Sequence, residues 1–365
     1  MKNRIIVMFI LFFFIISIVG VYSTSYILPS DYRELYLKQL IWYLIGFIIM
    51  YLIYRGKKGF FYKYSVILYI IGNLLLLLVL FFGTRTNGAI AWFNIPGIGT
   101  FQPSEFMKIC LIILFSTELD KYNKMVKNIK TEFTLIIKCL FILLIPTILT
   151  FLEPDTGNVI IYIIIYISML FAYGIGYKWV IITGLICIVG ITLFGYLYFY
   201  KKELFVNIFG TNFFYRIDRL LEWKNKEGMQ LENALAAIGS SPKYGYGIGK
   251  TPIYIPEANT DFISSVIISN IGFYLSTGII LLFLLFDILL IILAIKNNNI
   301  NRYLIVGILS ILFFQQIQNI GMNIGILPIT GITLPFISYG GSSLISYLIL
   351  ISLITNINKQ KKQSN

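Results

Sequence analysis

The sequence predicts an all-α membrane protein, a polytopic bundle of about ten transmembrane helices with a long extracellular loop between the seventh and the eighth. Hydrophobic residues make up 58% of the 365 residues, and the mean hydropathy is +0.83; both values lie far above the balance of soluble proteins. Apolar runs recur along the chain, for example at 5–20 and 135–151. No part of the charge pattern separates a soluble unit, so we expect residues 1–365 to form a single transmembrane domain.

Each expected helix follows from the rule that one crossing needs about 20 mostly apolar residues. The first helix begins after Met-Lys-Asn-Arg, is longer than the core of a signal peptide and has no Ala-x-Ala cleavage signature, so we expect it to stay uncleaved. The eighth is long, which predicts a tilted or broken helix. The expected ranges are 5–28, 38–54, 60–82, 104–119, 133–152, 157–174, 178–199, 262–295, 303–326 and 339–357.

Positive charges between the helices predict the orientation, because cytoplasmic connections carry an excess of lysine and arginine. One set of connections is strongly basic, whereas the opposite set of short loops holds only Arg33, Lys38 and Arg85. We therefore expect both termini in the cytoplasm and the loop of about residues 200–261 outside, since long loops translocate largely regardless of charge. The net charge of +13 then follows from topology and predicts no nucleic-acid partner. The basic set comprises Lys2, Arg4, Arg55, Lys57, Lys58, Lys63, Lys121, Lys124, Lys127, Lys130, Lys178, Lys296, Arg302, Lys359, Lys361 and Lys362.

Asp261 is the first candidate for catalysis, because it ends the long charged loop and directly precedes an apolar span. The chain contains no histidine, so a general base that works near neutral pH has to be a carboxylate, a lysine or a tyrosine. Glu257 lies four residues earlier in the same loop. We expect both carboxylates at the outer membrane surface.

A second polar group lies around the start of the fourth helix. Pro103 suits the first turn of a helix, and Glu105 in that turn complements the helix dipole. Glu105 and Lys108 are three residues apart and therefore share one helix face. One interpretation is a structural ion pair with Trp92 as an interfacial anchor; the other is a polar site for an anionic lipid-linked substrate.

Two further segments are expected on the outer face. Asp155 either only caps the sixth helix or also supports a site. The stretch 325–343 is apolar but contains two prolines and several glycines. It is either an ordinary outer loop or a re-entrant segment that lines a site, because non-helical backbone at membrane depth needs protein or a wet cavity around it. Asp287, inside the eighth span, is expected to pair with a neighbouring helix or to reach water near the cytoplasmic end.

Other patterns disfavour three kinds of site or function. Cys110, Cys139 and Cys187 lie inside predicted spans without paired or ligand-type spacing, so we expect no disulfide and no zinc site. The polar clusters gather on the outer face, whereas a transporter more often places its ionisable groups near the middle of the membrane.

With these motifs in place, the chain resembles the shape, elongation, division and sporulation (SEDS) family, which includes RodA, FtsW and SpoVE. The resemblance covers nearly the whole chain, and the joint order and loop placement of its short motifs make it specific. They are Asn87-Gly-Ala89 with Trp92, Gln102-Pro-Ser-Glu105 with Lys108, Pro154-Asp155-x-Gly157, Arg216-x-x-Arg219-Leu, Gly228-x-Gln230, Ala237-Ile-Gly-Ser240, Pro256-Glu-Ala-x-Thr-Asp261, and the run 327–343 that ends in Ser-Tyr-Gly-Gly-Ser-Ser.

The resemblance implies an inverting peptidoglycan glycosyltransferase that polymerises lipid II in the bacterial cell membrane, with Asp261 as general base. It also implies a class B penicillin-binding protein, a transpeptidase with one membrane helix, as partner. No cofactor is assigned, although a divalent cation, Mg²⁺ or Mn²⁺, is a candidate to help neutralise pyrophosphate. The residues expected to bind or surround substrate are Trp92, Glu105, Lys108, Asp155, Arg216, Arg219, Glu257, Ser338, Gly340 and Gly341.

The chain departs from the family pattern at several positions. Ile90-Ala91 stand where a basic residue usually precedes the tryptophan, and Arg85 is the nearest substitute. Asn259 replaces a common histidine, Ser269-Asn270 replace an acidic pair, and Ser240-Ser-Pro242 interrupts a usual Gly-Gly.

Two other functions stay open at this point. A lipid II flippase would need alternating access and ionisable groups along its lumen. A non-catalytic scaffold would only recruit the transpeptidase. The motifs do not distinguish a role in elongation from a role in division.

Overall fold

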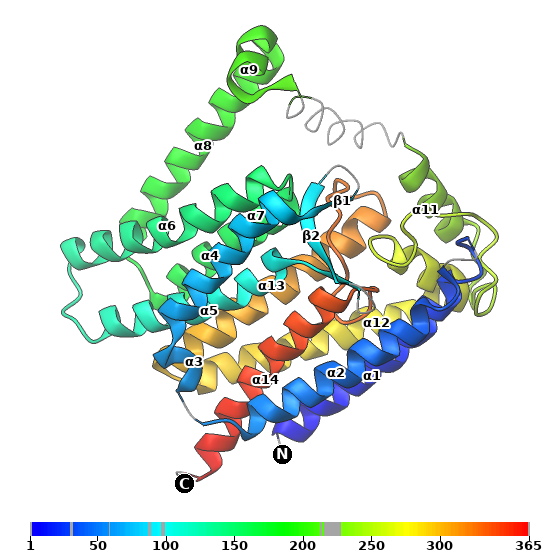
Figure 1. Cartoon of the computed structure of the whole chain (residues 1–365), viewed down its shortest axis with the longest axis horizontal. Coiled ribbons are helices and arrows are strands. Elements are labelled where there is room, and N and C mark those ends of the chain that lie inside the picture. Colours follow the sequence, from blue (N-terminus) through cyan, green and yellow to red (C-terminus); the bar gives the residue numbers. More distant parts are fainter. Residues whose placement is uncertain are drawn as a thin grey trace.

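The computed structural model describes residues 2–29, 32–57, 59–86, 89–95, 99–211, 214 and 228–363, and shows a bundle of helices with a small sheet on it (Figure 1). The helices are α1 (Lys2–Thr24), α2 (Leu35–Arg55), α3 (Phe60–Lys63), α4 (Ser65–Phe82), α5 (Pro103–Asn123), α6 (Ile129–Leu152), α7 (Thr156–Tyr173), α8 (Tyr177–Tyr200), α9 (Lys202–Phe209), α11 (Met229–Gly239), α12 (Ile263–Lys296), α13 (Asn299–Asn323) and α14 (Gly341–Gln363). The strands are β1 (Thr84–Thr86), β2 (Ala89–Ile95) and β3 (Gly99–Phe101).

Every expected transmembrane range coincides with helical structure, which confirms the predicted fold class. The range 60–82 is divided into α3 and α4. Within the described residues, eight helices are long and apolar enough to cross a membrane, and the apolar part of α14 (Gly341–Ile357) is shorter. The number of ten crossings therefore stays a prediction.

Helix α5 forms the centre of the bundle. It contacts α4, α6, α7, α13 and α14, and nearly all of its residues between Pro103 and Leu119 are buried. Charged residues in a membrane bundle face its interior and pair there. The position of α5 therefore explains why this span carries more charge than its neighbours.

Helix α12 is broken, as its length predicted. Gly272 has non-helical angles (φ 77°, ψ 179°), and the loop between α11 and α12 binds to the carbonyl groups next to this break. Tyr246 N donates to Ser269 O (3.0 Å) and Gly247 N donates to Asn270 O (2.9 Å). A Cβ at Gly272 would lie 2.3 Å from Gly245 N, so only glycine allows this close approach.

The sheet is a feature that the sequence analysis did not predict. The strands pair in the order β1-β2-β3, both pairs antiparallel, in the connection between α4 and α5. Ile90 N on β2 donates to Glu153 O (3.2 Å), which joins the sheet to the end of α6. Strands β1 and β3 have three residues each, and β2 begins with Ala-Ile-Ala-Trp-Phe, so none of them shows an alternation of apolar and polar residues.

Helix α8 projects away from the bundle together with α9 (Figure 1). None of the described residues in the most apolar stretch of α8 is buried against the rest of the protein. The attachment lies at its first turn, where Trp179 stacks on Phe133 of α6 with ring centroids 5.5 Å apart. The segment expected as a loop, 200–261, contains α9 and α11; Arg216 and Arg219 lie outside the described residues.

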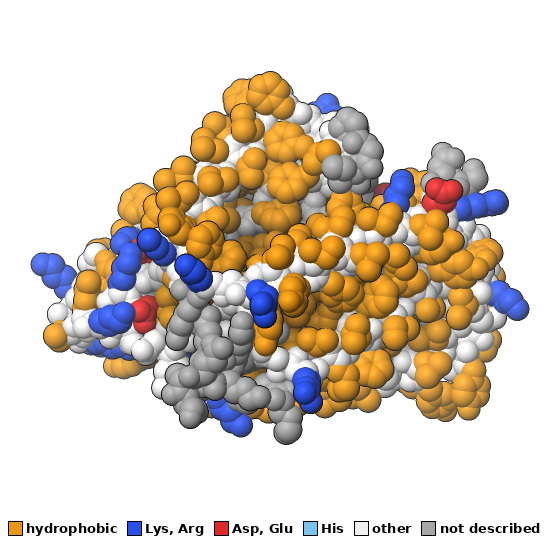
Figure 2. All heavy atoms as spheres, turned by 60° about the horizontal axis from the view of Figure 1, so that its bottom comes forward, with side chains coloured by type: hydrophobic (Ala, Val, Ile, Leu, Met, Phe, Trp, Pro, Cys, Tyr) orange, Lys and Arg blue, Asp and Glu red, His pale blue; other side chains and the backbone are white. Residues whose placement is uncertain are grey.

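The start of α1 and the end of α14 lie at the same end of the bundle (Figure 1). Viewed with this end forward, the surface is largely apolar with many lysines and arginines and few acidic groups (Figure 2). Exposed basic side chains on the helix ends and connections include Arg55, Lys57, Lys63, Lys121, Lys124, Lys127 and Lys130.

Candidate active site

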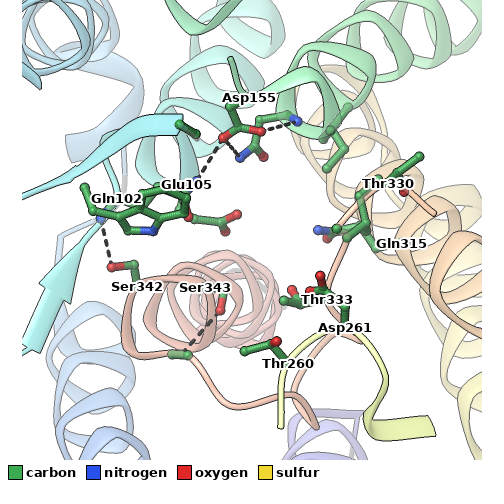
Figure 3. Close-up of a pocket in the computed structure, with 18 of the residues that line it drawn as sticks. Gln102, Glu105, Asp155, Thr260, Asp261, Gln315, Thr330, Thr333, Ser342 and Ser343 are labelled. Carbon is green, nitrogen blue, oxygen red and sulfur yellow. Dashed lines mark hydrogen bonds between the residues drawn. The ribbon is translucent and has the colours of Figure 1, made fainter. Parts of the chain in front are cut away.

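A cavity of about 410 Å³ opens among the sheet, the starts of α5 and α7, the loop before α12, helix α13 and the segment before α14 (Figure 3). Most of its labelled side chains are polar, and they point into the cavity from different elements. The wall contains four carboxylates, those of Glu105, Asp155, Glu257 and Asp261. No lysine or arginine among the described residues lines it. The lining therefore has acidic side chains and no basic ones within the described part of the chain.

Asp261 lies in this wall, as expected, at the end of the loop before α12. Figure 3 shows it beside Thr260 and Thr333. Burial raises the pKa of the Asp261 carboxyl to about 7, and the negative charge of Glu257 contributes to the increase. Within the described part of the chain, no side-chain or backbone group donates a hydrogen bond to this carboxylate. A carboxyl group that is free and titrates near neutral pH has the properties of a general base.

Gly331 lies next to the Asp261 carboxylate in the cavity wall. Gly331 has a φ of 70°, which favours glycine. A Cβ there would lie 3.5 Å from Asp261 Oδ2, an ordinary contact, so the backbone angle rather than space selects glycine. Glu257 also lines the cavity, and its carboxylate accepts a hydrogen bond from Thr260 Oγ1 (Oε2, 3.0 Å).

Glu105 and Lys108 form a buried ion pair, with 2.7 Å between Lys108 Nζ and Glu105 Oε1. The second oxygen, Glu105 Oε2, accepts a hydrogen bond from Ser346 (3.1 Å). Lys108 is fully buried, lies 5.7 Å from the ring centroid of Tyr347 and does not line the cavity. The structural ion pair that the spacing left open is thus present, and its carboxylate reaches the cavity wall. A direct contact of Lys108 with substrate stays a prediction.

Asp155 caps α7 and also lines the cavity, so it is more than a helix cap. Its Oδ1 accepts from the backbone N of Asn158 (3.1 Å). Its Oδ2 accepts from Gln102 Nε2 (2.8 Å), Ser104 Oγ (3.1 Å) and Asn158 Nδ2 (2.8 Å). Because its acceptor sites are filled by protein donors, Asp155 joins the starts of α5 and α7.

The segment before α14 lines the cavity, as the re-entrant interpretation predicted. It is non-helical from Ile324 to Gly340 and contributes Gly340 and, with the first residue of α14, Gly341. Ser338 does not reach the cavity. Its Oγ donates to Thr260 O (2.6 Å) and accepts from Leu334 N (2.9 Å). Ser338 therefore connects the segment before α14 to the backbone of the loop that carries Asp261.

Trp92 lines the cavity from β2. Arg85, the expected substitute for the family's cation, is exposed on β1 and pairs with Ile90 in the sheet; it does not line the cavity. The replacements Ser269 and Asn270 lie at the break of α12. Ser269 Oγ and Asn270 Nδ2 are buried without a hydrogen-bond partner among the described residues.

Several lining residues were not predicted. Asn158 Oδ1, Gln315 Oε1 and Thr330 Oγ1 are buried acceptors without a partner in the described structure, and all three residues line the cavity. Gln315 projects from α13 into it (Figure 3). Polar residues inside an otherwise apolar span were the signal for Gln315, because they are costly in a membrane unless they serve a purpose.

Two other carboxyl groups lie away from the cavity wall. Glu153 is fully buried, and burial together with the nearby charge of Asp155 raises its pKa to about 9. Asp287 accepts a hydrogen bond from Gln316 Nε2 on α13 (Oδ1, 3.3 Å), which confirms the expected pairing with a neighbouring helix.

Cys110 and Cys139 are free thiols, whereas the side chain of Cys187 lies outside the described part. The described residues contain no group of three or more His, Cys, Asp or Glu side chains arranged to hold a metal ion.

Comparison with known proteins gives consistent results in sequence and structure. The family model of cell cycle proteins named for FtsW, RodA and SpoVE matches residues 3–363. The probable peptidoglycan glycosyltransferase FtsW of Wigglesworthia glossinidia brevipalpis is 35% identical over 97% of this chain and 94% of its own. The stage V sporulation protein E of Bacillus subtilis is 30% identical over 95% and 94%.

Two solved structures share the fold. One is a chain of a peptidoglycan synthase complex that coordinates polymerization and crosslinking, with a TM-score of 0.79, 24% identity and coverage of 98% of this chain and 97% of that one. The other is the rod shape determining protein RodA of Thermus thermophilus, with a TM-score of 0.68, 24% identity and coverage of 96% of both chains.

Proposed function

The chain belongs to the family of cell cycle proteins that includes FtsW, RodA and SpoVE, and we propose that it is a peptidoglycan glycosyltransferase that polymerises lipid II. Relatives that carry the name probable peptidoglycan glycosyltransferase support the activity. The observation that carries the proposal is the Asp261 carboxylate. It lies in the wall of an open cavity lined by polar side chains, has no hydrogen-bond donor among the described residues, and has a pKa of about 7.

In the proposed reaction, Asp261 removes the proton from the 4-hydroxyl of the acceptor sugar. The hydroxyl oxygen then attacks the anomeric carbon of the donor from the face opposite its pyrophosphate. The bond between that carbon and the pyrophosphate oxygen breaks, undecaprenyl pyrophosphate leaves with the electron pair, and inversion gives a β-1,4 linkage. One base suffices because pyrophosphate is a good leaving group. A general base contributes about 10²- to 10⁴-fold in rate, so positioning of the two substrates has to supply most of the rest.

The cavity suits the sugar hydroxyls of the acceptor. Its wall presents acceptor oxygens, among them the carboxylate of Asp261, which receives no hydrogen bond from the described residues. Hydroxyl groups can donate to such acceptors, whereas a pyrophosphate carries only acceptor oxygens and negative charge. Trp92 in the same wall offers an apolar face for a sugar ring.

The donor pyrophosphate therefore needs positive charge from outside the described cavity wall. Lys108 is compensated by Glu105, and the cavity lining adds no other basic side chain among the described residues. Arg216 and Arg219 are candidates, because arginine binds phosphate oxygens bidentately. A divalent cation, Mg²⁺ or Mn²⁺, that accompanies the pyrophosphate would act in the same way.

We propose that the chain works in the bacterial cell membrane with both termini in the cytoplasm. The basic residues on the end of the bundle that holds both termini support this orientation. We also propose a class B penicillin-binding protein as partner, since a related fold belongs to a synthase complex that couples polymerization with crosslinking.

The cavity favours an enzyme over the two alternatives. A flippase needs ionisable groups along a path through the membrane, but four carboxylates lie around one cavity, and Asp287 is buried against Gln316 away from it. A scaffold without activity has no need of a free carboxylate in a cavity.

The test is polymerisation of purified lipid II by the wild-type protein together with its transpeptidase partner, with glycan strands resolved by gel electrophoresis. Glycan strands with β-1,4 linkages are expected. Translocation of lipid II across liposomes without polymer, lost in Asp287→Ala, would instead identify a flippase.

A further inference from the structure

The backbone of Asp261 is held by two asparagines of α13. Asn319 Nδ2 and Asn323 Nδ2 donate to the carbonyl oxygen of Asp261, at 2.8 and 2.9 Å. Both asparagines are fully buried. Amide side chains in a membrane-spanning helix are costly unless they are paired, so two of them directed at one carbonyl group indicate a specific purpose.

Residues of α12 bind the oxygens of both amides, and a backbone N–H of α12 fixes the orientation of Asn323. Ser265 N and Ser265 Oγ donate to Asn323 Oδ1 (3.0 and 2.6 Å), and Ser264 Oγ contacts Asn319 Oδ1 (2.6 Å). Because a backbone N–H can only donate, the oxygen of Asn323 has to face Ser265 and its NH₂ group has to face Asp261. Asn319 Nδ2 also donates to Ile332 O (2.8 Å), which connects the same amide to the segment before α14.

The two carbonyl groups before Asp261 are held in the same way. Tyr339 N donates to Asn259 O (2.8 Å), and Ser338 Oγ donates to Thr260 O (2.6 Å). Three consecutive peptide carbonyls at the end of the loop thus accept hydrogen bonds from groups that are distant in sequence. These bonds fix the main chain that carries the Asp261 side chain.

We propose that Asn319 and Asn323 are positioning residues for the Asp261 base, which they orient through its backbone carbonyl. The inference rests on the proposed glycosyltransferase function. Donors placed on the carboxylate itself would stabilise its charged form and lower its pKa, which would make it a weaker base. Donors placed on the backbone hold the residue in position and leave the carboxylate free for the proton of the substrate.

The test compares steady-state lipid II polymerisation by the full chain with its partner for wild type, Asn319→Ala, Asn323→Ala and Gln318→Ala. Gln318 is the matched control, since it is a buried amide of the same helix that donates to a backbone carbonyl, that of Pro328 (2.7 Å). We expect kcat to fall by about 10²-fold in the two asparagine variants, as for a misplacement of about 1 Å, with KM changed by less than about threefold. Gln318→Ala should retain most of the activity.

The pH profile separates positioning from general destabilisation. When the Asp261 carbonyl loses a donor, the Asp261 carboxylate gains access to water and its pKa falls. The pH range in which kcat/KM rises, the ascending limb of the profile, should therefore move to lower pH in the asparagine variants. Loss of folded protein alone would lower the amplitude and leave the limb unmoved. If Asn323→Ala does not fold, Asn319→Ala serves as the test, because it removes the other donor to the same carbonyl.

Two results would overturn the inference, and they are distinguishable. If wild type makes polymer and the asparagine variants match Gln318→Ala in kcat and in the position of the limb, the positioning role is wrong and the proposed function stands. If the folded wild-type complex makes no polymer, the proposed function fails and the inference fails with it.

Discussion

Removal of Lys108 is expected to destabilise the protein strongly, because it leaves Glu105 charged and buried. Helix α5 and the residue that caps its C-terminal end, Lys124, offer two comparable ion pairs for this test. Lys108–Glu105 and Lys124–Asp120 have the same separation of 2.7 Å, but the side chains are 0% and 7% exposed in the first pair and 70% and 13% exposed in the second. The same substitution, lysine to methionine, can therefore be made at a buried site within α5 and at an exposed site at its C-terminal cap.

The expected magnitudes differ several-fold. Breaking a buried ion pair costs about 3–5 kcal/mol because an uncompensated charge remains, whereas an exposed pair contributes about 0–1 kcal/mol. Lys108→Met should therefore lower the free energy of unfolding by about 3–5 kcal/mol and Lys124→Met by less than about 1 kcal/mol. The double variant Lys108→Met with Glu105→Gln should recover most of the loss, because it removes the buried charge.

The measurement is the thermal denaturation of each purified variant in the same detergent, with the loss of stability compared with that of the wild type. Equal shifts for Lys108→Met and Lys124→Met would refute the reasoning, as would a double variant no more stable than Lys108→Met. Either result would mean that water reaches Glu105 when its partner is removed.

Two further predictions concern the chemistry. Polymerisation should rise with pH through about 7, because burial raises the pKa of Asp261 to about 7 and only the ionised carboxylate accepts a proton; a pH–rate profile that is flat from pH 5 to 8, or that rises near pH 4, would contradict this. Chelation of divalent cations by EDTA should lower polymerisation, and Mg²⁺ or Mn²⁺ should restore it, because the described cavity wall has acidic side chains and no lysine or arginine to receive the pyrophosphate; unchanged polymer yield in EDTA would exclude the cation from the mechanism.

Hydropathy alone predicted most of the fold. Each apolar stretch of suitable length became a helix, because a membrane leaves few other ways to satisfy the backbone. The length of α12 predicted a tilted or broken helix. The location of the break at Gly272 depends on the loop between α11 and α12, which the sequence pattern does not connect with this position. The strands were missed because a short strand is set by its pairing with neighbours rather than by its own composition.

The candidate site was predicted less completely than the fold. Asp261, Glu105 and Asp155 were identified by their positions at helix starts, where carboxylates are conspicuous. Gln315 was missed, although an amide in an apolar span is a signal of the same kind.

Contacts between distant segments explain the remaining differences. The spacing of Lys108 from Glu105 shows that they share a helix face. It does not show that Lys108 is fully buried and that only Glu105 lines the cavity. Ser338 was expected near the substrate, whereas its hydrogen bond to Thr260 O depends on a contact across 78 residues. Arg216 and Arg219 lie outside the described residues, so their roles stay predictions.

The most direct test of the proposed mechanism is lipid II polymerisation by Asp261→Asn beside wild type and Asp287→Asn. The two substitutions each neutralise one half-buried or buried aspartate of comparable size, but only Asp261 lines the cavity. The mechanism predicts that Asp261→Asn loses at least about 10²-fold in rate, the contribution of a general base, while Asp287→Asn retains polymerisation. Full polymer yield from Asp261→Asn would contradict the assignment of Asp261 as the base.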